Sequence, residues 1–369
     1  MKKTLKILHI VGARPNFVKI APLMEAFRAR SGVQSVLVHT GQHYDETMSD
    51  LFFRQLGIPE PDLNLEVGSS SHAVQTADIM RAFEPVALKE KPDAVVVVGD
   101  VNSTIACGLV AVKLGIQLAH VEAGLRSFDR TMPEEINRVL TDTISNFLFC
   151  TEQSGVDNLA REGISKNKVF LAGNVMIDTL MKHKAKADQS DILRRLKLEK
   201  GRYAALTLHR PANVDDPAVF GRILDALDAI QRDMPLVFPI HPRTRKNLEA
   251  SALNARVKGM QGLRLMEPLG YLDFLKLTSE ARLVLTDSGG IQEECTILKV
   301  PCLTLRENTE RPSTVEAGAN RVVGRDPARI LAGYRAIVSG AVSEIRTPPL
   351  WDGHAAERIA KILVDRLSA

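Results

Sequence analysis

The sequence is poor in the features that define several large protein classes, and cysteine is the first of them. Its 369 residues include only four cysteines, none in a C-x-x-C pair or at zinc-finger spacing: Cys107, Cys150, Cys295 and Cys302. A disulfide framework or a structural zinc site is therefore not indicated. Each cysteine stands in an apolar or helical context, so we expect reduced core residues in a cytoplasmic protein.

Charge of one sign and long hydrophobic runs are also scarce. The net charge is only +4, and no dense Lys/Arg block interleaved with aromatic residues occurs, so the sequence predicts no nucleic-acid partner. No uninterrupted apolar run reaches the length of a membrane span, which predicts no membrane partner. The N-terminal run 5–11 contains Lys6 and His9 and ends at Gly12, so it predicts a first β-strand rather than a signal peptide. The small excess of positive charge still favours an anionic small molecule as a ligand.

Two nucleotide-binding signatures are missing as well. The residues Gly12-Ala-Arg-Pro follow the first predicted strand in place of G-x-G-x-x-G, and the chain has no Walker A sequence. The chain therefore lacks the main sequence evidence for an ordinary NAD-dependent dehydrogenase or a P-loop NTPase. His209 and His241 each follow a predicted strand, but they form no H-x-x-x-H pair or His/Cys cluster, so we predict neither a metal site nor a cofactor.

The chain does contain a regular alternation of short β-branched runs and helix-length amphipathic segments, which is typical of a parallel sheet with crossover helices. Strands are predicted at 6–11, 34–39, 94–98, 116–121, 146–150, 168–171, 203–208, 236–240, 263–266, 283–286 and 302–305. Helices are predicted at 19–30, 44–55, 72–89, 103–113, 133–145, 218–232, 271–279, 290–296, 327–339 and 355–367. The continuous valine run 94–98 indicates a central strand that is buried on both faces.

The length of the chain exceeds one ordinary core, and the strand–helix rhythm restarts after about residue 165. We therefore predict an α/β fold of two Rossmann-type, doubly wound domains that face a cleft. The first domain is expected to span 1–167 and the second 168–354, with the C-terminal helix 355–369 packing back on the first. The polar stretch 182–200 is predicted as a helical elaboration that begins the second domain. In such folds ligands bind beyond the carboxyl ends of the strands.

The segment 120–138 is the most informative part of the chain. It concentrates acidic and basic side chains directly after a predicted strand: Glu122, Arg126, Asp129, Arg130, Glu134, Glu135 and Arg138. A charged loop in this place suits chemistry, although a solvated surface loop would have the same composition. Asp100 ends the valine strand, where it is a helix N-cap, a functional carboxylate, or both.

Three further motifs suit an anionic ligand. Arg14 and Lys19 follow the first strand near a helix N-terminus, where they serve a diphosphate or are two surface cations. The run Ser288-Gly289-Gly290 opens another helix, and its glycines let backbone N–H groups approach a phosphate. Glu294 lies one turn further along and is placed to accept hydrogen bonds from ribose hydroxyls, while Arg311 follows a later strand within reach of the same phosphates.

These motifs together resemble those of the non-hydrolysing UDP-N-acetylglucosamine 2-epimerases over almost the whole chain. The resemblance rests on six motifs in the same order: GARPNFVK (12–19), GDVNST (99–104), HVEAGLR with PEEINR (120–138), LHR (208–210), TDSGGIQEE (286–294) and TERP (309–312). It implies a GT-B-like pair of domains, a homodimer, no cofactor or metal, and a UDP-sugar bound in the interdomain cleft. The implied reaction interconverts UDP-GlcNAc and UDP-ManNAc for surface polysaccharide synthesis.

The resemblance also assigns roles to individual residues. Asp100, Glu122 and Glu134 would be the essential carboxylates, with His209 assisting, and the choice of acid and base on each face of the sugar stays open. Asp129, Arg130 and Glu135 are expected to be structural. UDP or its phosphates would be held by nine residues: Arg14, Lys19, Arg138, His241, Ser288, Gly289, Gly290, Glu294 and Arg311.

The sequence departs from the family pattern in two places. Many bacterial members carry Gln-His-Arg where this chain has Gln-His-Tyr44, and His-Arg-Arg-Glu-Asn where it has His-Arg-Pro-Ala212-Asn. In those members the replaced residues help bind a second UDP-GlcNAc that activates the enzyme, so we expect weak or no activation of this kind here. The departures also leave open a related substrate, UDP-2,3-diacetamido-glucuronate, and a GT-B UDP-sugar glycosyltransferase is the nearest rival enzyme.

Overall fold

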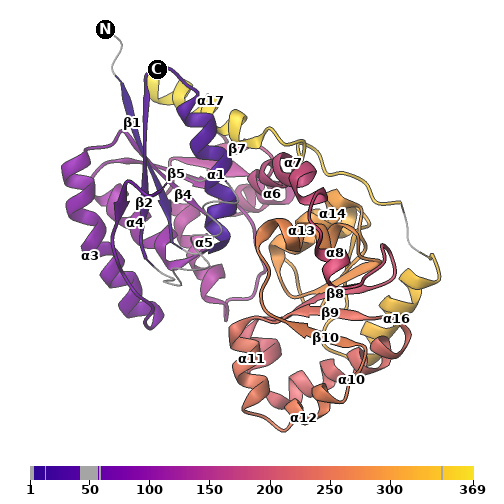
Figure 1. The fold of residues 1–369 in the computed structure, drawn as a ribbon. Coiled ribbons are helices and arrows are strands. Elements are labelled where there is room, and N and C mark those ends of the chain that lie inside the picture. Colours follow the sequence, from indigo (N-terminus) through magenta and orange to yellow (C-terminus); the bar gives the residue numbers. More distant parts are fainter. Residues whose placement is uncertain (1–3, 13, 42–56, 58–59, 342–343) are drawn as a thin grey trace. The chain divides into compact units, whose positions relative to one another are not determined.

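The computed structural model describes residues 4–369 apart from Ala13, 42–56, 58–59 and 342–343. The chain divides into two compact units, each with its own sheet. The first consists of Met1–Lys182 and Pro349–Ala369, and the second of His183–Pro348. Figure 1 traces the chain from the first sheet through the second and back to the first unit at its C-terminal helix. Each unit is described by itself below.

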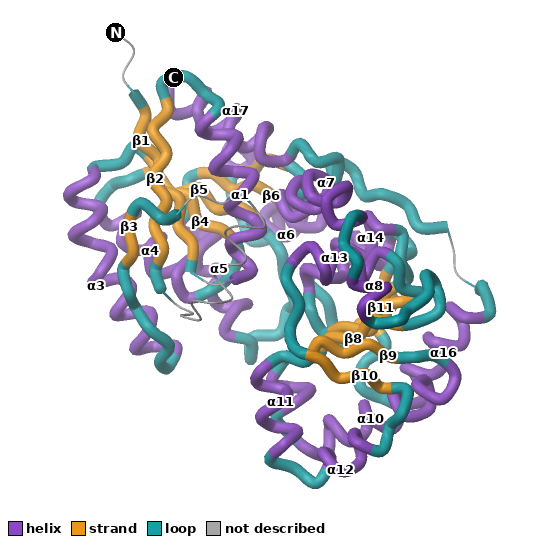
Figure 2. The backbone as a smooth tube through the Cα atoms, in the orientation of Figure 1, coloured by secondary structure: helices purple, strands orange, loops and turns teal. Residues whose placement is uncertain are grey.

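The first unit contains a parallel sheet of seven strands in the order β3-β2-β1-β4-β5-β6-β7. The order runs outward in both directions from β1, which is the doubly wound arrangement with a switch point between β1 and β4. Figure 2 shows these strands forming one twisted sheet with helices packed against it. The strands are β1 (Leu5–Val11), β2 (Val33–His39), β3 (Leu63–Asn64), β4 (Ala94–Val98), β5 (Gln117–Val121), β6 (Phe147–Cys150) and β7 (Val169–Leu171).

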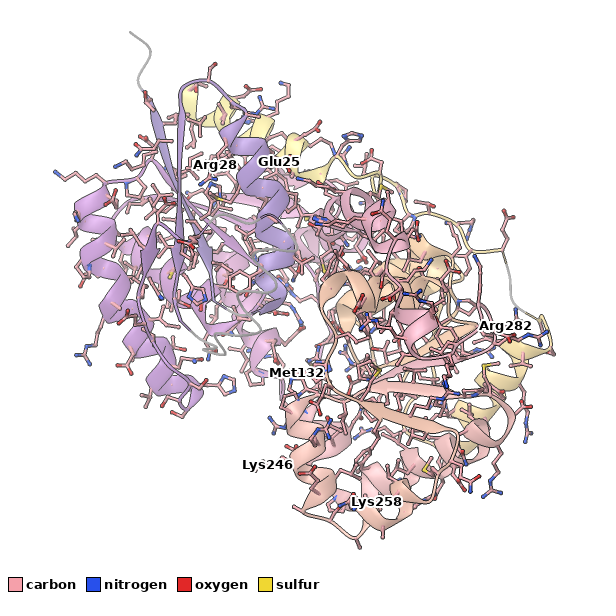
Figure 3. The ribbon with its side chains drawn as sticks, in the orientation of Figure 1. Glu25, Arg28, Met132, Lys246, Lys258 and Arg282 are labelled. Carbon is pink, nitrogen blue, oxygen red and sulfur yellow. The ribbon has the colours of Figure 1, made fainter. Side chains whose placement is uncertain are left out.

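Helices connect these strands and cover the sheet. Every residue of β4 is buried, as the valine run predicts, and α3 and α4 pack together over Val95 and Val97. Helix α1 packs against the C-terminal α17, and Arg28 lies in the last turn of α1 (Figure 3). The helices are α1 (Arg14–Arg28), α3 (His72–Glu90), α4 (Asn102–Lys113), α5 (Pro133–Ile144), α6 (Gln153–Arg161), η1 (Lys166–Lys168), α7 (Val175–Asp188) and α17 (Ala355–Ser368).

The second unit repeats the design with six parallel strands in the order β10-β9-β8-β11-β12-β13. Its strands are β8 (Ala204–Thr207), β9 (Leu236–Pro239), β10 (Leu263–Met266), β11 (Leu283–Thr286), β12 (Cys302–Thr304) and β13 (Asn320–Val322). Its helices are α8 (Ile192–Arg195), α9 (Pro211–Val214), α10 (Pro217–Asp233), α11 (Pro242–Glu249), α12 (Leu253–Lys258), α13 (Tyr271–Ser279), α14 (Gly289–Leu298), α15 (Pro312–Glu316) and α16 (Pro327–Val338). Apolar residues of β8, β9, α10 and α16 form its largest core cluster.

The boundary between the units lies later than the sequence suggested. The predicted strand 168–171 was assigned to the second domain, but as β7 it pairs in parallel with β6 and extends the first sheet. Helix α7 then begins in the first unit and continues past Lys182 into the second. The chain returns at Pro349, where the indole N–H of the buried Trp351 donates to the Thr151 carbonyl at 2.9 Å.

Other element boundaries differ in ways that have local reasons. Helix α1 begins at Arg14 rather than Lys19, because Pro15 fits the first turn of a helix, where no N–H is needed. The sequence did not predict β3, β13, α6, η1, α9, α11, α12, α15 or the first half of α7. The helix predicted at 44–55 lies outside the described residues. The four cysteines are buried free thiols, and no described helix is long and apolar enough to cross a membrane.

Candidate functional site

In the first unit, the candidate carboxylates gather where β4 and β5 end. Glu122 follows β5 in a left-handed conformation, with φ 72°, and its Oε2 lies 2.6 Å from Nζ of Lys19 on α1. Both partners are buried. A Cβ placed on Gly99 would lie 3.1 Å from Lys19 Nζ and 3.7 Å from Glu122 Oε2, so this ion pair sits directly against the turn that leads into Asp100.

Asp100 is held from α5. Arg138 contacts Asp100 Oδ2 through Nε at 3.0 Å and through Nη2 at 2.6 Å. The side chain of Asn137 donates to the backbone carbonyl of Asp100 at 2.9 Å. Arg138 is only 2% exposed, whereas the Asp100 side chain is 27% exposed. The guanidinium therefore fixes a carboxylate that remains open to solvent.

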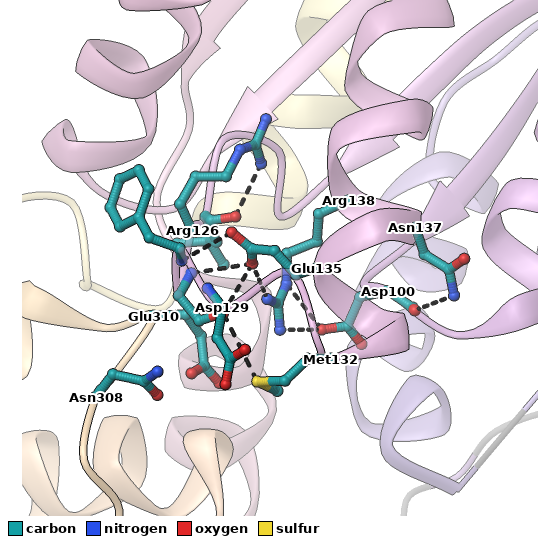
Figure 4. A network of polar contacts seen from close by, with 12 residues as sticks. Asp100, Arg126, Asp129, Met132, Glu135, Asn137, Arg138, Asn308 and Glu310 are labelled. Carbon is teal, nitrogen blue, oxygen red and sulfur yellow. Dashed lines mark hydrogen bonds and ion pairs between the residues drawn. The ribbon is translucent and has the colours of Figure 1, made fainter.

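Helix α5 has a polar buried face. Its buried residues are Glu135, Arg138, Thr141 and Asp142, whereas Ile136 and Leu140 are exposed. Glu135 accepts hydrogen bonds from the backbone of Ser127 and Phe128 and from Arg138 Nη1, as Figure 4 illustrates for this network. Glu135 thus ties the charged loop and Arg138 together.

Glu134 and Asp129 occupy more open positions than Glu135. Glu134 is half-buried in the first turn of α5, where a negative charge interacts favourably with the helix dipole. Asp129 accepts hydrogen bonds from the backbone and hydroxyl of Thr131, which closes a local turn. Of the anion-binding residues predicted in this unit, Lys19 and Arg138 both meet carboxylates, and the side chain of Arg14 lies outside the described part of the chain.

In the second unit, His209 is organised by a carboxylate that the sequence analysis did not select. Asp287, fully buried after β11, lies 2.9 Å from His209 Nδ1 and accepts the backbone N–H groups of His209 and Arg210. Burial alone would raise the pKa of Asp287, but His209 and these N–H groups hold it below its usual value. The His209 ring lies 5.6 Å from that of His241, the N-cap of α11.

The predicted phosphate cradle opens α14. Ser288 is its N-cap residue but makes no side-chain capping bond there, and Gly289 is the first helical residue. A Cβ on Gly289 would lie 2.6 Å from Glu310 Oε1, so a side chain at this position would displace the Glu310 carboxylate. The start of α14 therefore combines a glycine pair with backbone N–H groups that intrahelical bonds cannot satisfy.

Two other predicted ligand residues lie deeper than expected. Burial raises the pKa of the Glu294 carboxyl to about 7, although a hydrogen bond with Tyr271 opposes this. Arg311 is also buried, and its Nε lies 2.6 Å from Glu293 Oε1. Like Arg138, Arg311 is thus engaged by protein carboxylates rather than presented alone to a ligand.

The residues around Asp100 and Glu122 in the first unit and around His209 and Ser288 in the second lie at equivalent places, at the carboxyl ends of the strands of each sheet. The sequence placed Lys19, Asp100, Glu122 and Arg138 near one such edge, and His209, His241 and Ser288 near the other. It missed Asp287, which contacts His209, and Asp142, which contacts His120 at the end of β5. Among the described residues, no group of three or more His, Cys, Asp or Glu side chains is arranged to hold a metal ion.

Comparison with known proteins agrees with this geometry. The family model for UDP-N-acetylglucosamine 2-epimerase matches residues 25–364. A UDP-N-acetylglucosamine 2-epimerase of Methanocaldococcus jannaschii is 44% identical over 364 residues, covering 97% of this chain and 99% of that protein. The UDP-2,3-diacetamido-2,3-dideoxy-D-glucuronate 2-epimerase of Pseudomonas aeruginosa is 40% identical over 363 residues, with 97% and 99% covered.

Solved structures give the same assignment. The crystal structure of the Methanocaldococcus jannaschii UDP-GlcNAc 2-epimerase in complex with UDP-GlcNAc and UDP matches with a TM-score of 0.91 and 43% identity, covering 98% of this chain and all of that one. The Neisseria meningitidis enzyme bound to UDP-GlcNAc matches with a TM-score of 0.89 and 29% identity, covering 98% and 100%. The fold is thus the GT-B-like pair of parallel-sheet domains, and the chain belongs to the UDP-N-acetylglucosamine 2-epimerase family.

Proposed function

We propose that the protein is a non-hydrolysing epimerase that interconverts UDP-GlcNAc and UDP-ManNAc. The observation that carries the proposal is the pair of anchored carboxylates at the ends of β4 and β5, Asp100 on Arg138 and Glu122 on Lys19. Inversion at C2 needs a base on one face of the sugar and an acid on the other. Two carboxylates fixed on one sheet edge supply such groups, and family membership supplies the UDP-sugar.

The proposed reaction proceeds by elimination and re-addition. A base removes the C2 proton while the C1–O bond to the diphosphate breaks, which gives 2-acetamidoglucal and UDP. Both then add back, with the proton delivered to the opposite face of C2. Asp100, Glu122 and Glu134 are the proposed acid–base groups, and His209, oriented by Asp287, assists at the diphosphate. A cation that is paired with a carboxylate, as Lys19 is with Glu122, restrains the position of that carboxylate.

The UDP moiety is assigned to the second unit. The backbone N–H groups in the first turn of α14, which intrahelical bonds do not use, suit the diphosphate, and Gly289 and Gly290 allow its close approach. Glu294 is the proposed ribose ligand, and His241 and Ser288 line the same sheet edge. Because Arg138 and Arg311 are buried against carboxylates, we assign them the task of holding those carboxylates, in place of the direct phosphate contact first expected.

The diacetamido-glucuronate analogue is the second candidate substrate, because the Pseudomonas aeruginosa relative carries that name at 40% identity. A glucuronate adds a carboxylate at C6, which would need a cation that UDP-GlcNAc does not need. Comparing kcat/KM for both nucleotide sugars decides between them. We place the product in surface polysaccharide synthesis and the enzyme in the cytoplasm, where its free thiols would stay reduced.

We also propose that the protein forms a homodimer through the outer face of α5. Ile136 and Leu140 are 40% and 48% exposed on this helix, and Val112 on the adjoining α4 is 36% exposed. Apolar side chains on an outward helix face are typical of a contact surface. Ile136→Glu with Leu140→Glu should convert a dimer to a monomer in light scattering. A wild-type mass of 40.5 kDa in solution would contradict the proposal.

The catalytic proposal is tested by incubating the pure protein with UDP-GlcNAc in D2O. The expected result is deuterium at C2 in both the substrate and newly formed UDP-ManNAc. A GT-B glycosyltransferase would leave the nucleotide sugar unchanged without an acceptor, and a hydrolysing enzyme would release free ManNAc and UDP. Either outcome contradicts the proposal.

A further inference from the structure

Three donors from the motif at 120–126 converge on one carboxylate that the proposed reaction does not use. Asp142, 1% exposed on α5, has Oδ1 at 2.7 Å from His120 Nδ1. Its Oδ2 lies 3.0 Å from the backbone N of Gly124 and 2.7 Å from Nη2 of Arg126. Arg126 continues to Glu162 through Nε and Nη2 at 2.8 and 2.7 Å. Asp142 is therefore the centre of a buried network.

The two ring nitrogens of His120 contact different residues. His120 is completely buried on β5, and its Nε2 lies 2.8 Å from the carbonyl oxygen of Gly99. A backbone carbonyl accepts only, so Nε2 carries a hydrogen. Burial alone would raise the pKa of Asp142, but the charge and hydrogen bond of His120, followed by those of Arg126, hold it below its usual value. The other ring nitrogen, Nδ1, lies 2.7 Å from Asp142 Oδ1, so both ring nitrogens of His120 have fixed partners.

The second hydrogen bond of His120 reaches the residue that precedes Asp100. Gly99 is in the left-handed region, with φ 71°, and its N–H donates to Val121 between His120 and Glu122. The His120 ring thus fixes the carbonyl of a turn that otherwise has conformational freedom, because glycine carries no Cβ. The direction of the Asp100 side chain depends on that turn, and Glu122 lies two residues beyond the ring.

We propose that Asp142 and His120 are positioning residues for the epimerisation, which together fix the Gly99 turn so that Asp100 and Glu122 keep one mutual geometry. The inference rests on the proposed function. Asp142 orients the His120 ring through Nδ1, and His120 joins the ends of β4 and β5 through Nε2. Small errors in the placement of an acid–base group lower the rate of the chemical step while leaving substrate binding largely intact.

The first test is Asp142→Asn, with Asp178→Asn as its matched control. Asp178 is also a buried carboxylate of the first unit, and it accepts the backbone N–H groups of Ala355 and Ala356 at the start of α17. Both changes remove one buried negative charge and both should lower Tm. We expect D142N to reduce kcat at least about 10-fold with KM changed less than about 3-fold, and D178N to leave both within about 2-fold. Equal kcat for the two variants below their Tm values would overturn the proposal.

A second measurement reads the His120 ring in the wild-type protein and does not depend on activity. In protein labelled with ¹⁵N-histidine, one buried histidine should show a hydrogen on Nε2 that is protected from exchange with solvent, because Nε2 donates to the Gly99 carbonyl. Its signal should be missing from His120→Gln, which identifies it. A His120 ring without a hydrogen on Nε2 would refute the inference even if D142N fails to fold. If wild-type protein gives this signal but no C2 exchange, the proposed function fails while the geometry of the pair stands.

Discussion

His9 gives the sharpest prediction about stability. It lies on β1, is completely buried, and neither ring nitrogen has a hydrogen-bond partner among the described residues. Its ring packs against Phe27 at 5.0 Å. Burial, aided by the nearby positive charge of Arg28, lowers the pKa of His9 from 6.5 to about 3. The folded protein therefore keeps this imidazole neutral where the unfolded chain takes up a proton.

The sign and size of the effect follow from linkage. Between pH 6.5 and pH 3 the unfolded state binds more protons at this site, so stability falls as pH falls through that window. The contribution is fully present above pH 6.5. At pH 5 the loss is RT ln[(1 + 10^1.5)/(1 + 10^−2)], or about 2 kcal/mol for a pKa change from 6.5 to about 3.

The perturbation is His9→Leu, which keeps an apolar side chain of similar volume and removes the titration. We expect wild-type protein to lose about 2 kcal/mol more than the variant between pH 7.5 and pH 5. Urea unfolding followed by tryptophan fluorescence measures this, because the single Trp351 is buried in the first unit with His9. His354→Gln, at a histidine whose side chain is 61% exposed, is the control and should follow the wild-type pH dependence. Parallel losses for wild-type protein and H9L would refute the reasoning.

Three further predictions concern the site. Glu134→Gln should lower the C2 exchange rate by about 100-fold or more while calorimetry shows little change in UDP affinity, and near-normal exchange would contradict its assignment. Gly289→Ala should weaken UDP binding about 10-fold or more, because the new methyl group would meet Glu310 Oε1 at 2.6 Å and crowd the start of α14; unchanged affinity would remove the cradle from the site. With Tyr44 and Ala212 in place of charged residues, initial rates should be hyperbolic in UDP-GlcNAc, and UDP-ManNAc alone should be turned over without a lag. Sigmoidal rates would show that substrate activation persists.

Much of the fold could be predicted because the physical signal is local. The valine run of β4 and the alternation of β-branched and amphipathic segments identify buried parallel strands and crossover helices from composition alone. The same logic placed Asp100 and Glu122 at one sheet edge and Ser288 at another, because carboxyl ends of parallel strands share an edge. Elements with little periodicity, such as the two-residue β3, gave no comparable signal.

The sequence by itself determined the fold class and the family and supplied the candidates for the reactive side chains, since each depends on residue type and spacing along the chain. Tertiary structure alone decided the partners of those side chains. Asp142 is 22 positions from His120, and Asp287 is 78 positions from His209. Arg138, which the sequence suggested as a phosphate ligand, contacts Asp100 across 38 positions of the chain. A buried charge needs an oppositely charged partner, and which residue supplies that partner depends on how distant segments of the chain pack together.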